Sequence, residues 1–308
     1  MAKRGKLQTR VEYVLGRSLL AVLGVLPRPF ALKLGVVTGH LGYLLAGRLR
    51  RTGDRNLEIA FPELSIAERH RLLKESFKSL GRMLAEFSQF PKFTVGQLRD
   101  LIDYAPGEID YVRQAEAKGR GIIFLTGHIG PWEILSFGWS ALQYPISFLV
   151  RPLDNPLLED LVERRRTRFG NRAIDKKSAA RQALRLLREG GTLGILSDLN
   201  TQEFEGVFVP FFGKLACTTA GIATLALKTD ATVIPTWAIW DRSKRRYCFH
   251  AAPAVEVVRT GDHKKDIEVN TGRFAAAVEK IVRAYPDQWL WIHKRWKTRP
   301  PGEADLYE

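Results

Sequence analysis

Two residues that could move a proton, His128 and Glu133, stand five positions apart in the chain. An imidazole whose tautomer is held by a carboxylate is an effective general base. Positions five apart on a continuous helix point about 140° away from each other, so the pair could not meet on one. Gly130 permits a turn, however, and Pro131 suits the first position of a helix. We therefore expect His128 in a loop and Glu133 in the first turn of a helix, with Glu133 holding one imidazole nitrogen.

This arrangement would be the His-carboxylate half of a Ser-His-Asp relay in which the hydroxyl of a substrate takes the place of the serine. The oxyanion formed by such an attack needs donors, for which we expect backbone amides near Gly130 or a nearby arginine. The alternative is that His128 is a hydrogen-bonded loop residue and Glu133 a charge that favours the start of a helix.

Further charged side chains follow other apolar runs. Arg151 follows one directly and suits phosphate or carboxylate binding through its planar fork, or it is a surface residue. The basic cluster at residues 164–168, with Arg166 and Arg168, could bind an anionic head group or an acidic carrier, or be a solvated face. Asp198 follows a third run, where it could orient Arg151 or the cluster, hold a water, or cap a turn.

Residues 207–213 read as an apolar, aromatic loop that contains Phe208, Phe211 and Phe212. Apolar loops are uncommon unless they line a pocket or touch a membrane, so this loop is a candidate surface for an acyl chain. Simple core packing is the alternative.

Four short apolar runs, separated by helical stretches, follow residue 107 and must position these side chains. Buried strands that alternate with helices indicate an α/β domain with a mostly parallel sheet. Open sheets of this kind carry their chemistry beyond the carboxyl ends of the strands, which is where the charged residues stand. The runs are residues 121–126, 146–150, 192–197 and 232–239.

Other elements complete the expected fold. Ser65 and Glu68 form a capping box that begins a helix running to about Phe90. We expect two further strands in residues 247–258, at an antiparallel edge, and a last long helix at residues 270–284.

The net charge of the chain limits the classes of partner that it could bind. The chain of 308 residues carries 48 Lys and Arg against 33 Asp and Glu, a formal charge of +15 that attracts nucleic acid, acidic lipids, phosphorylated substrates or an acidic carrier protein. A hydrophobic content of 45% excludes intrinsic disorder, and charges interrupt every apolar run, which excludes a polytopic membrane protein. Two cysteines without a CxxC pair indicate a reducing compartment.

Two moderately apolar segments with basic flanks, residues 11–26 and 30–49, open the chain. They suit helices that lie in the interface of an anionic membrane. Ordinary core helices, or one short or tilted span at residues 11–26, are the alternatives. We therefore divide the chain into membrane-associating helices at residues 1–50 and an α/β domain at residues 51–308.

Seven blocks, in order along the chain, resemble the late-stage lipid A biosynthesis acyltransferases of the lauroyl and myristoyl type, within the wider lysophospholipid and glycerolipid acyltransferase superfamily. One such block would be weak, but seven in the order of the family are specific. They are 55–62 (RNLEIAFP), 126–133 (TGHIGPWE), 151–156 (RPLDNP), 167–171 (TRFGN), 197–200 (SDLN), 206–213 (GVFVPFFG) and 286–296 (PDQWLWIHKRW).

The resemblance implies an αβα domain with an H-x4-D/E motif, here His128 and Glu133. It further implies a bacterial inner-membrane enzyme of the cytoplasmic face, which moves a fatty acyl chain from acyl carrier protein or acyl-CoA to a hydroxyl of a phosphorylated, lipid A-type glycolipid. The positions tied to substrate binding by the resemblance are Arg151, Arg166, Arg168, Asp198 and Asn200.

The sequence leaves two alternative functions. The first is an acyltransferase for another glycolipid, such as a phosphatidylinositol mannoside. The second is a non-enzymatic binder of nucleic acid or a membrane surface, which we disfavour because the aromatic residues stand in apolar segments rather than among the basic clusters. We expect no metal and no cofactor, since neither histidines nor cysteines are spaced as a zinc site and no nucleotide-binding glycine motif is present.

Overall fold

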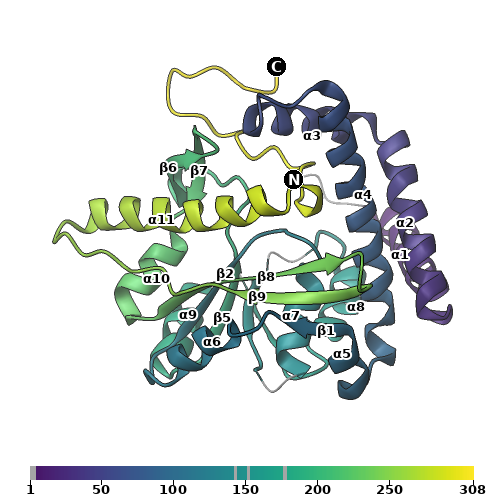
Figure 1. Cartoon of the computed structure of the whole chain (residues 1–308), viewed down its shortest axis with the longest axis horizontal. Coiled ribbons are helices and arrows are strands. Elements are labelled where there is room, and N and C mark those ends of the chain that lie inside the picture. Colours follow the sequence, from purple (N-terminus) through teal and green to yellow (C-terminus); the bar gives the residue numbers. More distant parts are fainter. Residues whose placement is uncertain (1–4, 142–143, 151–152, 176–178) are drawn as a thin grey trace.

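The structure is a computed structural model that describes residues 5–141, 144–150, 153–175 and 179–308. A sheet lies between two layers of helices, and further helices from the N-terminal part of the chain stand at one end of it (Figure 1). The predicted α/β class is therefore confirmed. Arg151 lies outside the described residues, so its expected role stays a prediction.

The main sheet of the described chain has seven strands, listed here in sequence order: β1 (Ile102–Tyr104), β2 (Ile122–Thr126), β3 (Ser147–Val150), β4 (Arg172–Asp175), β5 (Thr192–Leu196), β8 (Thr232–Asp241) and β9 (Arg246–Ala251). Their spatial order is β1-β9-β8-β2-β5-β3-β4. All neighbours from β8 to β4 are parallel, whereas β9 runs antiparallel to β8. The four predicted runs are all strands, and the mostly parallel sheet is confirmed.

Helices α5 to α11 and three-residue 3₁₀ turns precede, separate or follow these strands. They are η1 (Phe90–Lys92), α5 (Val95–Leu101), α6 (Ile109–Glu116), α7 (Trp132–Ala141), α8 (Pro156–Arg166), α9 (Ala179–Arg188), η3 (Glu203–Glu205), α10 (Gly221–Thr229), α11 (His263–Ala284) and η4 (Pro286–Gln288).

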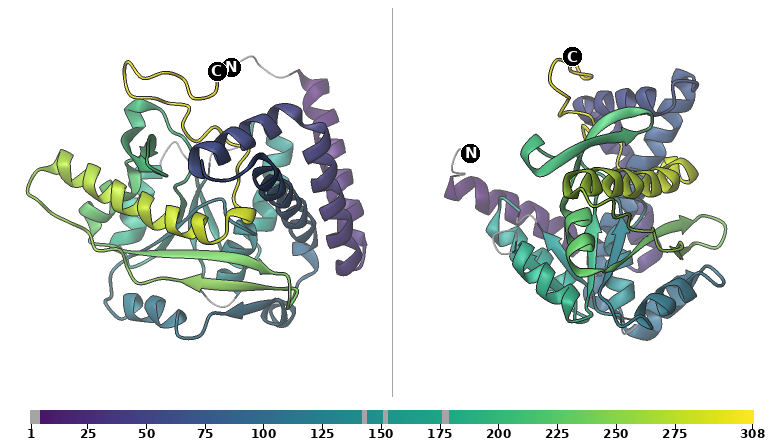
Figure 2. Two further views of the ribbon diagram at one scale, coloured as in Figure 1. Left: turned by 45° about the horizontal axis from the view of Figure 1, so that its top comes forward. Right: turned by 90° about the vertical axis from the view of Figure 1, so that its left-hand side faces the viewer.

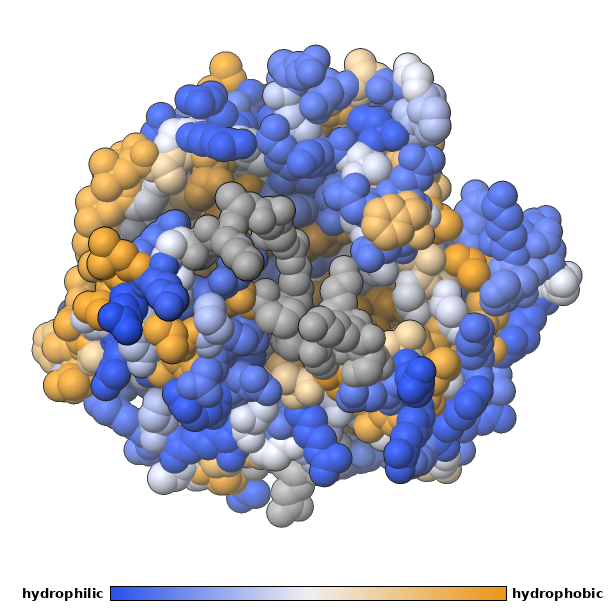
Figure 3. All heavy atoms as spheres, turned by 180° about the vertical axis from the view of Figure 1, so that it is seen from behind, coloured by the Kyte–Doolittle hydropathy of each residue, from blue (hydrophilic) through white to orange (hydrophobic). Residues whose placement is uncertain are grey.

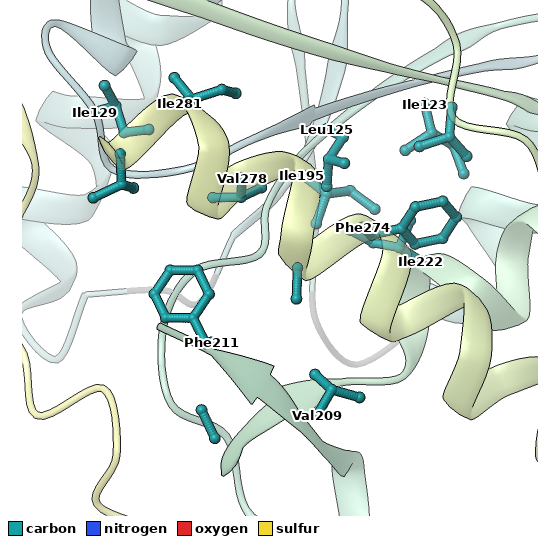
Figure 4. Close-up of a cluster of buried hydrophobic side chains, with 14 of the residues drawn as sticks. Ile123, Leu125, Ile129, Ile195, Val209, Phe211, Ile222, Phe274, Val278 and Ile281 are labelled. Atoms are coloured by element: carbon teal, nitrogen blue, oxygen red, sulfur yellow. The ribbon is translucent and has the colours of Figure 1, made fainter. Parts of the chain in front are cut away.

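The central strand β2 is buried on both faces and divides the core into two clusters. Ile123 and Leu125 belong to the cluster that also contains side chains of α9, α10 and α11, part of which Figure 4 shows. Ile122 and Phe124 belong to the cluster with α5, α6 and α7. Because successive strand residues point to opposite faces, this alternation places helices on both sides of the sheet, as the αβα expectation requires.

Two strand predictions need correction. Residues 247–258 give one strand rather than two, since beyond β9 only an isolated bridge joins Val255 to Val233. β9 is also not at the edge, because β1 pairs with its other side. Strands β1 and β4 were not predicted, since strands of three or four residues that include Asp103 or Arg172 show little apolar pattern.

Residues 207–213 do not form the expected loop. They belong to an antiparallel hairpin of β6 (Gly206–Phe211) and β7 (Lys214–Thr219), closed by Phe212 and Gly213 with φ of 51° and 71°. Positive φ at both central residues is typical of the tight turns that match the twist of a hairpin. Pro210 is exposed on β6, and an edge strand tolerates proline because no ladder donor is lost.

The N-terminal helices are α1 (Lys6–Val25), α2 (Arg28–Leu45) and α3 (Gly47–Ala60), and α1 and α2 lie outside the long helix α4 (Ile66–Gln89) (Figure 2). The predicted capping box of Ser65 and Glu68 begins α4. A Cβ on Gly35 or Gly39 of α2, or on Gly81 of α4, would collide with the backbone of the facing helix, so these glycines let α2 and α4 approach closely.

Within the described residues, no single helix is long and apolar enough to cross a bilayer. The pair α2 and α3, bent by 88° at its junction, meets the length and composition required only when both helices are taken together.

Candidate active site

The ends of two neighbouring strands bring the candidate base and a carboxylate together. β2 and β5 are parallel and in register, with Thr126 opposite Leu196. His128 stands two residues beyond the first of these and Asp198 two residues beyond the second. Because the offsets are equal, the side chains meet, and His128 Nδ1 lies 2.7 Å from Asp198 Oδ1. We name this contact the His128–Asp198 pair.

The Asp198 carboxylate is fully buried and is held by donors from two segments. Its Oδ2 accepts hydrogen bonds from the backbone N–H of His128 (2.6 Å) and from Trp289 Nε1–H (2.7 Å). Gly127 makes room for it, since a Cβ there would lie 2.9 Å from Oδ2. Burial by itself raises the pKa of the Asp198 carboxyl, but the adjacent His128 and the hydrogen bonds from His128 and Trp289 bring that pKa below its ordinary value.

An ionised Asp198 keeps the imidazole proton on Nδ1 and leaves Nε2 of His128 as the acceptor nitrogen. The His128 side chain is 16% exposed, while the Asp198 side chain is fully buried. Trp132 packs edge-on against the imidazole, with ring centres 5.0 Å apart. The geometry is that of a general base with one accessible nitrogen and a carboxylate behind it.

The predicted contact between Glu133 and His128 is wrong. Glu133 instead binds Arg166 with both carboxylate oxygens: Arg166 Nε donates to Oε2 at 2.8 Å, and Nη2 donates to Oε1. Glu133 is in the first turn of α7, from which its side chain reaches the last turn of α8, whereas the loop before α7 turns His128 toward β5. A fork-to-fork pair of this kind fixes both side chains strongly.

Two other residues expected to bind substrate make contacts within the protein: this corrects the prediction for the fully buried Asp198, whereas a contact of the partly exposed Asn200 with substrate stays a prediction. Asp198 faces His128 and Trp289, as described above, and has no exposed surface to offer. Asn200 bonds Thr298 with both ends of its amide: Nδ2 donates to Oγ1 (3.0 Å), and Oδ1 accepts from the backbone N–H (2.9 Å). Asn200 therefore anchors the C-terminal segment to the end of β5.

Arg168 is exposed and donates from Nη1 to the backbone oxygen of Phe90 (2.5 Å). With Arg164, Arg165 and two apolar residues it lines a cavity of about 320 Å³ that His128 does not line. Its expected contact with substrate stays a prediction.

The three aromatic residues of the presumed loop have different positions. Phe211 is buried beside Trp289 and Trp296, among the side chains under α11 in Figure 4. Phe212 is also buried, with the Arg283 guanidinium 4.3 Å from its ring centre. Both are core residues rather than acyl-chain contacts, because the hairpin packs against α11. Phe208 alone of the three is half-buried, and it lines a cavity of about 310 Å³.

Sequence reasoning missed three residues of the C-terminal segment: Trp289, His293 and Arg295. His293 Nε2 accepts a hydrogen bond from the backbone N–H of Asn200 (3.0 Å), and burial lowers its pKa to about 4, so His293 is neutral. Burial lowers the pKa of Arg295 to about 10, yet Arg295 remains a cation that interacts favourably with Asp198. The block at residues 286–296 was visible in the sequence, but nothing in it indicated a partner.

One family model matches nearly the whole chain. Residues 2–298 match the family model of the bacterial lipid A biosynthesis acyltransferases. The chain belongs to this family. It is therefore an acyltransferase, and the resemblance noted in the sequence is confirmed at the level of the family.

Several lipid A acyltransferases are similar over nearly their whole length. The chain is 28% identical over 299 residues to the lipid A biosynthesis lauroyltransferase of Escherichia coli (strain K12), which covers 95% of this chain and 94% of the relative. It is 28% identical over 283 residues to the palmitoleoyltransferase of the same organism, covering 92% and 90%. The myristoyltransferase of that organism is 25% identical over 281 residues, covering 91% and 84%.

In this lipid A acyltransferase family member, the described residues contain no group of three or more His, Cys, Asp and Glu side chains that could hold a metal ion. The residues assembled around His128 are instead a carboxylate, an indole and a buried cation. This set is suited to holding and moving a proton.

Proposed function

We propose that the chain transfers a fatty acyl group from an acyl thioester to a hydroxyl of a lipid A-type saccharolipid, with His128 as general base. The His128–Asp198 pair carries this proposal, because it supplies an unprotonated Nε2 at the carboxyl end of the sheet. The H-x4-E spacing of His128 and Glu133 further supports a relationship to the wider lysophospholipid and glycerolipid acyltransferases.

The reaction needs only one base. His128 Nε2 takes the proton of the acceptor hydroxyl while its oxygen attacks the carbonyl carbon of the thioester. The tetrahedral intermediate then collapses, the C–S bond breaks, and His128 returns the proton to the leaving thiolate. No serine or cysteine nucleophile is required, because direct transfer depends on a base and on positioning.

The roles of the surrounding groups follow from their contacts. Backbone amides near Gly130 were expected as oxyanion donors, and the amide of Gly130 itself already donates to the backbone oxygen of Gln288 (2.8 Å). Arg166 uses Nε and Nη2 for Glu133, which leaves Nη1 for an oxygen of a phosphorylated acceptor. We assign Glu133 the role of holding Arg166, while Arg151 and Arg168 remain proposed contacts to substrate.

The proposed activity is tested with purified protein, a lipid A precursor, and acyl carrier protein or CoA thioesters of several chain lengths. We expect the mass of the precursor to rise by one acyl group, as mass spectrometry would show. A phosphatidylinositol mannoside serves as the competing acceptor in parallel reactions. Acylation of that lipid alone would overturn the proposed acceptor, and the preferred thioester identifies the donor.

We further propose that the enzyme works on the cytoplasmic face of the bacterial inner membrane. Large apolar side chains are exposed along α1 and α2, and in Figure 3 apolar residues gather on the side of the molecule where these helices lie. Basic residues are exposed on the same helices, which suits an anionic lipid surface. The exposed apolar residues include Leu7, Val14, Leu15, Val22, Val25, Phe30, Val37, Leu44 and Leu45.

Replacing both Leu15 and Val22 with glutamate is expected to weaken binding to vesicles of anionic phospholipid by at least about tenfold, because each exposed apolar side chain would contribute on the order of 1 kcal/mol or more at the interface. Sedimentation with vesicles measures this. Phe204→Glu is the matched control, since Phe204 is 84% exposed but lies next to β6, away from α1 and α2 (Figure 1). Equal loss of binding in both variants would contradict this attachment.

A further inference from the structure

The segment at residues 286–296, which we name the C-terminal strap, lies along the loop that carries His128. Ile129 and Trp289 form an antiparallel bridge. The backbone N–H of Leu290 donates to the oxygen of His128 (3.0 Å), and the N–H of Gly130 donates to the oxygen of Gln288 (2.8 Å). The backbone on both sides of the candidate base is thus held by the strap.

Buried side chains fix the strap in turn. Ser76 Oγ of α4 donates to the backbone oxygen of Trp289 (2.5 Å), and Asn56 Nδ2 of α3 donates to that of Trp291 (2.5 Å). The amide of Gln288 bonds the backbone of Trp240 in β8 through both ends, at 2.9 and 3.3 Å. Helices α3 and α4 and the sheet therefore all determine where the strap lies.

One side chain of the strap reaches the carboxylate behind His128. Trp289 is 2% exposed, and its Nε1–H donates to Asp198 Oδ2 at 2.7 Å. Within the part of the chain that the structure describes, the other hydrogen-bond donors to Asp198 both come from His128 itself. The Trp289 indole is consequently the donor that holds the Asp198 carboxylate independently of His128, the residue that the carboxylate orients.

We propose that Trp289 is a positioning residue for the acyl transfer, an inference that rests on the proposed role of the His128–Asp198 pair. The indole and the backbone amide of His128 together hold Oδ2, which leaves Oδ1 aligned with Nδ1. Without the indole, the carboxylate can rotate about its χ2 bond, and more of its charge is directed at the imidazole. The base is then less well oriented, and its protonated form is more stable.

Trp289→Phe tests the proposal, since it keeps an aromatic ring and removes the N–H donor. We expect kcat to fall by about tenfold to a hundredfold, as for loss of other hydrogen bonds that orient a functional ligand, with little change in KM for the acceptor. The acid-side midpoint of the profile of kcat/KM against pH should move to higher pH, because a stabilised imidazolium persists to higher pH. His293 is neutral and Arg295 charged across that range, so neither titrates with it.

Trp291→Phe is the matched control. Trp291 is fully buried, packs edge-on against Trp289 with ring centres 4.5 Å apart, and donates from Nε1 to the backbone oxygen of Pro286 (2.6 Å). The Trp291→Phe variant therefore loses an indole N–H of the same aromatic cluster, but one that does not bond Asp198. We expect the pH midpoint of this variant to equal that of the parent. Benzothienylalanine at position 289, which has the shape of the indole without its N–H, covers the case in which phenylalanine unfolds the protein.

The outcomes separate the two proposals. If the variants at position 289 match Trp291→Phe in kcat and pH midpoint while His128→Ala is inactive, Trp289 is only a packing residue and the inference fails. If His128→Ala remains active, the proposed function itself fails. A fall in kcat with a shifted midpoint at position 289 alone supports the inference.

Discussion

Replacing His128 with alanine is expected to reduce acyl transfer by about 10²–10⁴-fold, because a positioned general base contributes that much to proton transfer. The imidazole is the group of the site with an accessible acceptor nitrogen, held from behind by a fully buried carboxylate. Initial rates measured by mass spectrometry of the acylated product would show the loss, while the melting temperature checks that the variant is folded, since loss of the imidazole leaves the buried Asp198 carboxylate without one of its partners.

His263→Ala is the control for this variant, since His263 is an exposed residue at the start of α11. Its rate should equal that of the parent. An alanine variant of His128 that keeps the parental rate would exclude base catalysis by this residue.

Replacing Asp198 with asparagine is expected to reduce kcat by about 10²–10⁴-fold, as for the carboxylate of a serine-protease triad. Asp198 Oδ2 already accepts two N–H donors, so the asparagine oxygen must occupy that place. The new amide N–H then faces Nδ1 of His128, which must become an acceptor. The proton moves to Nε2, and the base is lost without any change in shape.

The Glu133→Gln variant tests whether Glu133 or Asp198 is the carboxylate that orients His128. Glu133 bonds Arg166 rather than His128, so we expect this variant to raise KM for a phosphorylated acceptor and to keep more of kcat than Asp198→Asn. The same assay at saturating acceptor separates the two effects. A larger fall in kcat for Glu133→Gln than for Asp198→Asn would restore Glu133 as the partner of His128 and overturn our assignment.

The sheet could be predicted because its central strands are continuous apolar runs, and β2, β5 and β8 stand where those runs do. The same rule placed His128 and Asp198 at the functional edge. What the sequence did not provide was the pairing: proximity along the chain favoured Glu133, whereas the parallel register of β2 and β5 joins residues 70 positions apart. Counting equal offsets from the ends of neighbouring strands would have found it.

Other parts of the fold were beyond local patterns. Residues 207–213 were expected to form a loop, yet they belong to an edge hairpin that tolerates Pro210 and uses Gly213 in its tight turn. Trp289 could not be predicted as a functional residue, because an indole has no preferred partner in sequence and its carboxylate stands 91 positions away.

The C-terminal strap has a consequence for how the protein is made. Since the loop of His128 is bonded to residues 288–290, the proposed proton-transfer centre cannot be completed until those residues have left the ribosome. Helices α1 and α2 emerge well before residues 288–290, so under the proposed membrane attachment a nascent chain would reach a lipid surface before it could act there. Under the same proposal, chains terminated before residue 288 would be attached but inert, and the enzyme would first become active at the membrane surface.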